Sequence, residues 1–358
     1  MGAFVDSLPD ALPDMTTAHA GADAGDSVEF AGPAIAARDL VKTYPKQIRA
    51  LDGLSFAVAP GTLFALLGPN GAGKSTTVKI LTTLTRADSG NALVAGHDVR
   101  REPDAVRRAI GVVGQKNSGG LSDTGRENLM LQGRMYGLRG TELKERVNDL
   151  LQRFGLWDAA NRVVRGYSGG MHRRLDIAMG LVHRPHVLFL DEPTTGLDPE
   201  VRAEMWEEIS ALRDDGVTIL LTTHYLEEAD RLADRVAIVD QGRIVVAGTS
   251  DELKGRLRGD SVQIDLAEPP GDGEVRKALA DLDGIGEVVL GERTLRARAA
   301  DGAAAVPVML AALEDQGVRV ASVMVSRPSL DDVYLRHTGR SFHDADALGA
   351  KNSQGGAA

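Results

Sequence analysis

Gly-Pro-Asn-Gly-Ala-Gly-Lys-Ser-Thr occupies residues 68–76 and fits the P-loop pattern G-x-x-x-x-G-K-[ST]. Glycines in such a loop let successive backbone N–H groups point toward a phosphate group. Residues 62–68 predict a short buried strand before the loop, and residues 76–84 predict a helix after it, whose N-terminal end is positive. The alternative is a glycine-rich turn between strand and helix, and a chance match has odds of roughly one in a hundred. These residues therefore predict a binding site for a nucleoside triphosphate.

Individual residues of the P-loop are expected to have separate tasks. Lys74 is expected to reach the β- and γ-phosphates, and the hydroxyl of Ser75 is expected to bind Mg²⁺. The other loop residues expected to contact the nucleotide are Gly68, Pro69, Asn70, Gly71, Ala72, Gly73 and Thr76.

An acidic pair follows a continuous apolar run further along the chain. Residues 187–190 predict a buried parallel strand, and Asp191 and Glu192 come directly after it. Like charges clustered in a partly dry site are unfavourable unless a cation lies opposite them. We therefore expect Asp191 to bind Mg²⁺ directly or through water, and Glu192 to orient and deprotonate the attacking water.

Polar residues also end other predicted strands. Gln115 ends the apolar run 109–115, and His224 ends the run 216–224. Either residue could simply be a solvated strand end, but ligands of α/β proteins gather where parallel strands end. Beside a P-loop and an acidic pair, a γ-phosphate contact is the favoured interpretation for His224. Tyr44 ends a strand ahead of the P-loop, where it is either a half-exposed strand tyrosine or a stacking partner for adenine.

A helical segment with apolar residues at helical spacing covers residues 124–158. It leads to a long helix within residues 165–185 that Ser168 is expected to cap. Gly169 and Gly170 leave the first turn of this helix bare, so its N-terminus is a second candidate anion site. Alternatively, a capping serine beside glycines could mark only the boundary between two secondary-structure elements, without binding an anion.

Composition limits the class of protein. The chain has 358 residues, which is long enough for two domains. Of its residues, 43% are hydrophobic and 26% are charged, as is usual for a globular protein. The net charge of −10 argues against a broad nucleic-acid surface, and the lack of cysteine excludes disulfides and cysteine-ligated metals. No apolar run approaches the roughly 18 residues of a membrane span. A secretory signal begins with a positively charged region, but no Lys or Arg occurs before Arg38. We expect a cytoplasmic protein that reaches a membrane only through a partner.

The predicted fold class is α/β, a P-loop NTPase domain with an inserted helical subdomain and a small C-terminal α+β domain. The second domain has the predicted order β-α-β-β-α-β of a ferredoxin-like sandwich, with its first helix at residues 274–282. It shows no acid–base pair or glycine loop, so a regulatory or docking role is expected. The expected divisions are a disordered acidic tail at 1–33, the NTPase domain at 34–257 with its helical subdomain at about 116–185, the accessory domain at 258–340 and a disordered tail at 341–358.

Taken together, these motifs resemble those of an ABC-type ATPase, specifically the nucleotide-binding subunit of an ABC transporter. The resemblance covers roughly residues 35–255. The motifs occur in the family's order: the P-loop, Gln115, Tyr-Ser-Gly-Gly-Met at 167–171, Leu-Phe-Leu-Asp-Glu at 188–192, Gly-Leu-Asp at 196–198 and His224.

The resemblance implies a role for each matching residue within one protomer. Tyr44 matches the aromatic residue that stacks on adenine, and residues 68–76 match the Walker A loop. Gln115 matches the Q-loop residue that contacts Mg²⁺ or the lytic water and signals to the membrane subunit. Asp191 and Glu192 match the Walker B pair, and His224 matches the switch histidine at the γ-phosphate.

The resemblance also implies a homodimer. Ser168, Gly169 and Gly170 match the signature motif, which in this family caps the ATP held by the opposite protomer, and Asp198 matches the aspartate that lies across the dimer. Tyr167 and Met171 stand where leucine and glutamine are usual, but the Ser-Gly-Gly centre is intact.

Two sequence features are similar to one subgroup, the daunorubicin/doxorubicin resistance exporters and related drug or lipid exporters. They are the variant signature at 167–171, followed by RRLDIAMGLV, and SLDDVYL at 329–335. This likeness implies a subunit that binds ATP and Mg²⁺, hydrolyses ATP and energises export of a drug-like or lipid substrate. It would act with a separate integral-membrane permease, at the cytoplasmic face of the cell membrane.

The main alternative is an ABC-type ATPase that acts on ribosomes or DNA. Relatives of that kind usually carry a second such domain or long coiled coils, and this chain has neither; its acidic balance also argues against nucleic acid. A third hypothesis, a nucleotide sensor without hydrolysis, would be expected to lack the acid found at Glu192.

Overall fold

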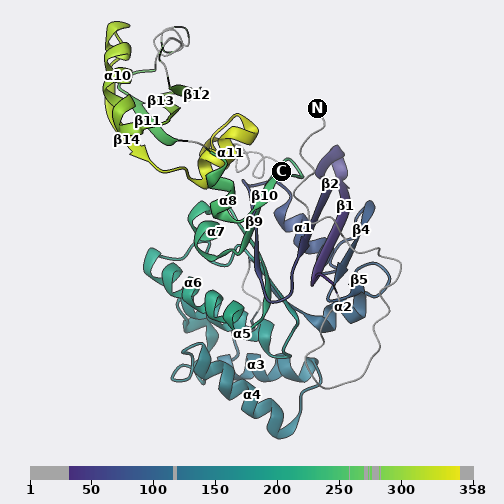
Figure 1. The fold of residues 1–358 in the computed structure, drawn as a ribbon. Helices are drawn as coiled ribbons and strands as arrows, with labels where there is room; N and C mark the ends of the chain where they lie inside the picture. The colour runs from purple at the N-terminus through teal and green to yellow at the C-terminus, as the bar shows by residue number, and fades with distance from the viewer. Residues whose placement is uncertain are drawn as a thin grey trace. The chain divides into compact units, whose positions relative to one another are not determined.

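The computed structural model describes residues 32–115, 119–257, 259–269 and 284–346, together with residues 273, 275 and 282 (Figure 1). The expected tails therefore lie mostly outside the described residues, as does most of the expected helix 274–282. The chain divides into two compact units between Ala247 and Gly248. None of the described helices has the length and apolar character needed to cross a membrane.

The first unit is built on a six-stranded sheet in the order β10-β9-β3-β8-β7-β6. Strand β3 pairs in parallel with β8 and β9, and β7 pairs in parallel with β6 and β8. The strands are β3 (Leu63–Leu67), β6 (Ile110–Val113), β7 (Val187–Asp191), β8 (Thr218–Thr223), β9 (Arg235–Asp240) and β10 (Arg243–Gly248). Every residue of β3, β7 and β8 is buried, which explains their continuous apolar runs. The parallel order places the carboxyl ends of these three strands side by side.

Hydrophobic cores cover both faces of this sheet. In β7, Val187 and Phe189 belong to one core, while Leu188 and Leu190 belong to the other, because successive side chains of a strand point to opposite faces. A four-stranded antiparallel sheet, in the order β2-β1-β4-β5, adds to the core that contains Phe189. Its strands are β1 (Ile35–Tyr44), β2 (Ile48–Val58), β4 (Ser89–Val94) and β5 (His97–Asp98), and a short 3-10 turn, η1 (Pro45–Gln47), joins β1 to β2.

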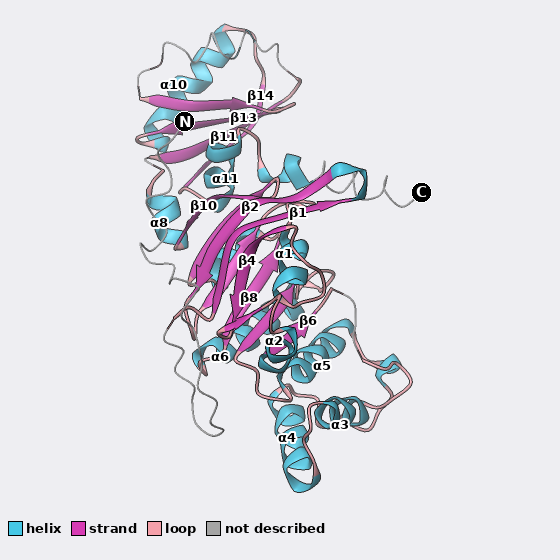
Figure 2. Ribbon diagram, turned by 90° about the vertical axis from the view of Figure 1, so that its right-hand side faces the viewer, coloured by secondary structure: helices cyan, strands magenta, loops and turns pink. Residues whose placement is uncertain are grey.

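Helices complete the first unit. They are α1 (Lys74–Leu81), α2 (Pro103–Ala109), α3 (Gly125–Met135), α4 (Gly140–Arg153), α5 (Gly169–Leu181), α6 (Pro199–Asp214) and α7 (Leu226–Leu232), with a short turn η2 (Val164–Gly166) before α5. Thr124 and Glu127 form a reciprocal capping box that starts α3. Helix α4 buries Leu143, Val147 and Leu150 along one face, as the helical spacing predicts. Figure 2 shows α3 and α4 beyond one end of the strands.

The second unit contains a four-stranded antiparallel sheet in the order β12-β13-β11-β14. Its elements are α8 (Ser250–Gly255), β11 (Asp260–Leu266), β12 (Ile285–Leu290), β13 (Thr294–Ala299), α10 (Gly302–Asp315), β14 (Val320–Ser326) and α11 (Leu330–Thr338). This strand order is that of a ferredoxin-like sandwich, so the predicted α/β domain followed by a small α+β domain is confirmed. Helix α8 packs against α11, and Arg336 donates to the backbone carbonyl of Arg256, which is why the second unit begins before residue 258.

The fold continues beyond Arg340, where the sequence predicts a disordered tail. Ser341 accepts a hydrogen bond from the backbone N–H of Asp344 at 3.1 Å and so starts a further helical turn. Phe342 is 4% exposed, and its ring meets that of Tyr334 edge to face with centroids 5.0 Å apart. Because the segment is polar overall, its composition does not reveal that one buried aromatic side chain, Phe342, packs against Tyr334.

Replacing Phe342 with alanine should destabilise the end of the second unit. Removal of a buried aromatic ring costs about 3 kcal/mol or more, so the free energy of opening α11 should fall by about that amount. Hydrogen exchange of the α11 amides measures it. The control is Met324→Ala, at a side chain that is 63% exposed, for which a change within about 0.5 kcal/mol is expected. If the α11 amides were equally protected from exchange in the Phe342 variant and in the unchanged protein, packing of Phe342 would not stabilise this end of the second unit.

Candidate functional site

The P-loop follows β3 and leads directly into α1, as the sequence predicts. A side chain at Gly68 would place its Cβ 2.3 Å from the carbonyl oxygen of Val239. Gly73 has a φ of +110°, and a Cβ there would lie 2.5 Å from the carbonyl oxygen of Ala50. Only glycine fits these two positions, because the loop passes against backbone atoms of its neighbours.

Lys74 lies inside this loop and is only 4% exposed. Its Nζ donates to the carbonyl oxygens of Gly68 at 2.6 Å and Pro69 at 3.1 Å. It also lies 3.6 Å from Oε1 of Glu192, at the end of β7. The P-loop lysine and the predicted catalytic carboxylate are therefore neighbours.

Ser75 and Asp191 come together across the ends of β3 and β7. The Ser75 hydroxyl donates to Oδ1 of Asp191 at 3.2 Å, and the Thr222 hydroxyl donates to the same oxygen. A serine hydroxyl beside a carboxylate provides the oxygen ligands that Mg²⁺ prefers, and nucleotide phosphates would provide more. The described residues thus fit a magnesium ion, although they contain no cluster of three histidine or acidic ligands.

Glu192 has an unusual backbone and a charged environment. Its φ is +50°, a left-handed conformation that costs a non-glycine residue on the order of 1–3 kcal/mol. Its N–H donates to the carbonyl oxygen of Thr222 at 3.0 Å, and its Oε2 lies 3.3 Å from Nδ1 of His224, without hydrogen-bond alignment. Burial raises the pKa of Glu192, but the contact with His224 and the positive charge of Lys74 outweigh it and leave the pKa below its ordinary value. The carboxylate is therefore ionised at neutral pH.

A second group of predicted residues gathers at the start of α5. Ser168 caps this helix by accepting a hydrogen bond from the N–H of Met171 at 3.3 Å. Ser168, Gly169 and Asp198 are exposed. A Cβ at Gly170 would lie 2.6 Å from a methyl group of Val201, so the helix start packs against the beginning of α6. The bare N-terminus of α5 and Asp198 therefore belong to one exposed region.

The remaining predicted residues lie at the margins. Tyr44 ends β1, half-buried, with Nζ of Lys42 5.7 Å from the ring centroid. Gln115 is exposed after the end of β6. Tyr167, which departs from the usual signature leucine, is buried and donates from its hydroxyl to the carbonyl oxygen of Ala159 at 2.8 Å. Tyr167 therefore packs into the core of the helical segment, and Ser168 beside it caps α5.

Three buried polar residues at the site were not predicted from the sequence. Thr222 bonds to both members of the acidic pair, as described above. Arg173 of α5 donates to three backbone carbonyls near the strand ends. Glu228 of α7 is fully buried and accepts hydrogen bonds from Thr194 at 2.7 Å and Trp206 at 3.0 Å. Thr222 could have been identified from the sequence, because it is a polar residue within an apolar strand. Arg173 and Glu228 could not, because they lie in helices that contain several other charged residues.

Comparisons with known proteins agree with this geometry. Residues 51–195 match the ABC transporter family, and residues 248–338 match the C-terminal domain of DrrA1-3-like ATP-binding proteins. The chain is 47% identical over 317 residues to the daunorubicin resistance ATP-binding protein DrrA2 of Streptomyces coeruleorubidus, an alignment that covers 88% of this chain and 98% of that protein. It is 45% identical over 313 residues to the daunorubicin/doxorubicin resistance ATP-binding protein DrrA of Streptomyces peucetius, covering 87% and 94% of the two chains.

A solved structure of similar fold is a dimeric ATP-binding cassette in a post-hydrolysis state, bound to ADP and Pi. It is 25% identical with a TM-score of 0.56, and the match covers 60% of this chain and 98% of that chain. The relatives extend over both units, and the resemblance noted in the sequence is confirmed. The chain belongs to the ABC transporter family, in the group of daunorubicin/doxorubicin resistance ATP-binding proteins.

Proposed function

We propose that this chain is the ATP-binding and ATP-hydrolysing subunit of an exporter that moves a drug-like or lipid substrate through a separate membrane permease. The observation that carries the proposal is the convergence of Lys74, Ser75, Asp191, Glu192 and His224 at the ends of three neighbouring strands. This set combines phosphate donors, oxygen ligands for Mg²⁺ and an ionised carboxylate. The names of the relatives, which link ATP binding to drug resistance, support the choice of substrate class.

The P-loop would bind the triphosphate. Backbone N–H groups of residues 68–76 and the ammonium of Lys74 would surround the β- and γ-phosphates, while Tyr44 would stack on the adenine. Ser75 and Asp191 would hold Mg²⁺, with Gln115 as a further oxygen ligand. A bound Mg²⁺ supplies charge neutralisation on the phosphates.

Glu192 would act on the water that attacks the γ-phosphorus. Its ionised carboxylate orients this water and accepts a proton while the new P–O bond forms and the bond to the ADP oxygen breaks. Because its pKa lies below the ordinary value, Glu192 is in the form that accepts a proton at neutral pH. His224, 3.3 Å from this carboxylate, would contact the γ-phosphate.

Two copies of the chain would complete each site. The exposed N-terminus of α5 at Ser168, with Gly169 and Gly170, would donate to the nucleotide held by the partner's P-loop, and Asp198 would face the same interface. One P-loop and one such helix per chain give two equivalent sites about a two-fold axis. ATP would favour the closed dimer, and hydrolysis would release it, which could drive a conformational change in the permease.

The permease would place the chain at the cytoplasmic face of the membrane. The alternative, action on ribosomes or DNA, is disfavoured by the net charge of −10. A pull-down of tagged Glu192→Gln protein with ATP from gently solubilised cells distinguishes the two. A polytopic membrane protein recovered in roughly equal amount supports the proposal, and recovery of ribosomal proteins or DNA in its place would overturn the export function.

Glu192→Gln should nearly abolish hydrolysis while leaving ATP binding intact. An amide cannot accept the proton, so turnover should fall by roughly 100-fold or more. The variant should also accumulate as an ATP-bound dimer. Phosphate release and size-exclusion chromatography with ATP measure the two effects. The matched control is Glu142→Gln on the exposed side of α4, which should behave as the unchanged protein. Wild-type turnover in Glu192→Gln would refute the assignment.

Lys74→Ala should weaken ATP binding. The substitution removes a charge-assisted contact with the phosphates, which is worth roughly 1.5–3 kcal/mol, so the Kd for ATP should rise about 10- to 100-fold. Titration with a fluorescent ATP analogue measures it. Lys79→Ala is the control, because Lys79 lies on the exposed face of the same helix. An unchanged Kd in the Lys74 variant would argue against the P-loop assignment.

A further inference from the structure

Arg173 lies in the second turn of α5 and connects this helix to two strand ends. It is 6% exposed. Its Nε donates to the carbonyl oxygen of Pro193 at 2.6 Å, Nη1 to that of Gly114 at 2.7 Å and Nη2 to that of Asp191 at 3.3 Å. One guanidinium therefore joins the α5 helix to the backbone after β6 and to the backbone at the end of β7.

Two of the three carbonyl groups that accept from Arg173 flank Glu192 in the sequence. The carbonyls of Asp191 and Pro193 belong to the residues immediately before and after it. Glu192 itself has the left-handed φ of +50°. A conformation of this kind persists only where surrounding contacts fix the backbone. Arg173 provides such contacts from one side, and Thr222 provides them through the N–H of Glu192 from the other.

The surroundings of Arg173 require an arginine. Burial lowers the pKa of its guanidinium, and the nearby carboxylates of Asp176, Asp191 and Glu228 oppose this shift, so the group stays charged. A planar guanidinium offers several N–H donors in fixed directions and can serve three separated carbonyls at once. A lysine ammonium is a single point of charge and cannot reach all three.

We propose that Arg173 is a positioning residue for ATP hydrolysis, which ties the backbone around Glu192 and the residue before Gln115 to helix α5. The proposal rests on the proposed ATPase function. Arg173 itself does not contact the nucleotide in this scheme; it acts through the placement of the Glu192 carboxylate. Since Ser168 lies at the start of α5, Arg173 also links the helix that is proposed to reach the second site of the dimer to the backbone around Glu192 of the same chain.

The test compares Arg173→Met and Arg173→Lys with the matched control Arg174→Met. Arg174 is the next residue on the same helix, and its partners are the carboxylates of Glu204 and Glu208 on α6. We expect Arg173→Met to lower kcat roughly 10- to 100-fold, the effect of a small misplacement of a catalytic group, with the Kd for ATP within about twofold. Arg173→Lys should fall between Arg173→Met and the unchanged protein, and Arg174→Met should keep kcat within about twofold.

The split between kcat and Kd decides the role. An unchanged kcat in Arg173→Met overturns the proposal, and so does a Kd that rises as much as kcat falls, because that result indicates general damage to the site. If thermal melting shows that Arg173→Met does not fold, the same two measurements on Arg173→Lys decide. Absence of ATPase activity in the unchanged protein would refute the proposed function itself, whereas full turnover in the Arg173 variants would refute only the positioning role.

Discussion

The ammonium group of Lys74 is almost fully buried, and the arrangement around the P-loop satisfies its charge. Removing a lysine charge from water is costly unless dipoles and an opposite charge replace the water. The carbonyls of Gly68 and Pro69 supply the dipoles, and the carboxylate of Glu192 supplies the charge at 3.6 Å. An opposite-charge contact near this distance is worth on the order of 4 kcal/mol at the effective dielectric of a protein site. Glycine is needed at positions 68 and 73 because the loop that surrounds the ammonium group passes close to neighbouring backbone, where a Cβ would collide.

The parallel sheet explains how residues distant in sequence share this site. Strands β3, β8 and β7 are neighbours in that order, and each leads into a segment of the proposed site. The P-loop follows β3, His224 follows β8, and the acidic pair stands at the end of β7. Thr222, on the middle strand, bonds to the acidic pair and thereby sets its position relative to the P-loop. The neighbouring strand ends thus hold these residues in place more rigidly than a single long loop would.

The sequence predicted what depends on local pattern. Continuous apolar runs identified the buried strands, and glycine spacing identified the P-loop. Two adjacent acids after a strand identified the pair of which Glu192 lies beside Lys74 and Asp191 beside Ser75. It did not predict Arg173 or Glu228, because their partners are backbone carbonyls or side chains from other elements, and no local pattern marks such convergence. The packed end at Phe342 was missed for a related reason: composition averages over a segment, whereas a single buried ring is enough to fix it.

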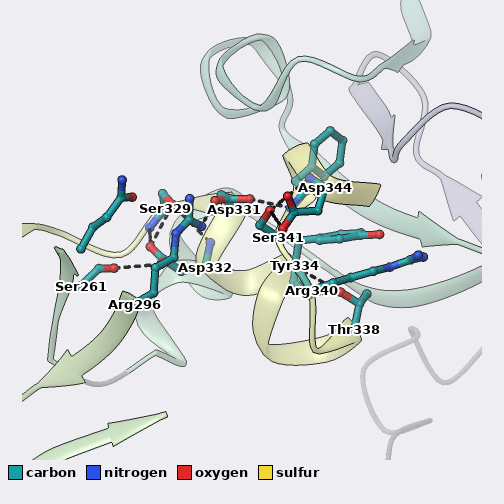
Figure 3. Close-up of polar contacts among 12 residues, drawn as sticks. Ser261, Arg296, Ser329, Asp331, Asp332, Tyr334, Thr338, Arg340, Ser341 and Asp344 are labelled. Carbon is teal, nitrogen blue, oxygen red and sulfur yellow. Dashed lines mark hydrogen bonds and ion pairs between the residues drawn. The ribbon is translucent and has the colours of Figure 1, made fainter. Parts of the chain in front are cut away.

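The motif SLDDVYL at residues 329–335 shows how a family motif can be accounted for by folding within one unit (Figure 3). Ser329 and Asp332 form the capping box of α11, and Asp332 also accepts a hydrogen bond from Ser261 of β11 at 2.9 Å. Asp331 pairs with Arg296 of β13, and its other oxygen accepts from the N–H of Phe342. The two acids therefore fasten the helix to the sheet and to the chain beyond it, while also stabilising the positive N-terminus of α11. These contacts engage the carboxylates of both acids, so the motif has a structural role within the second unit.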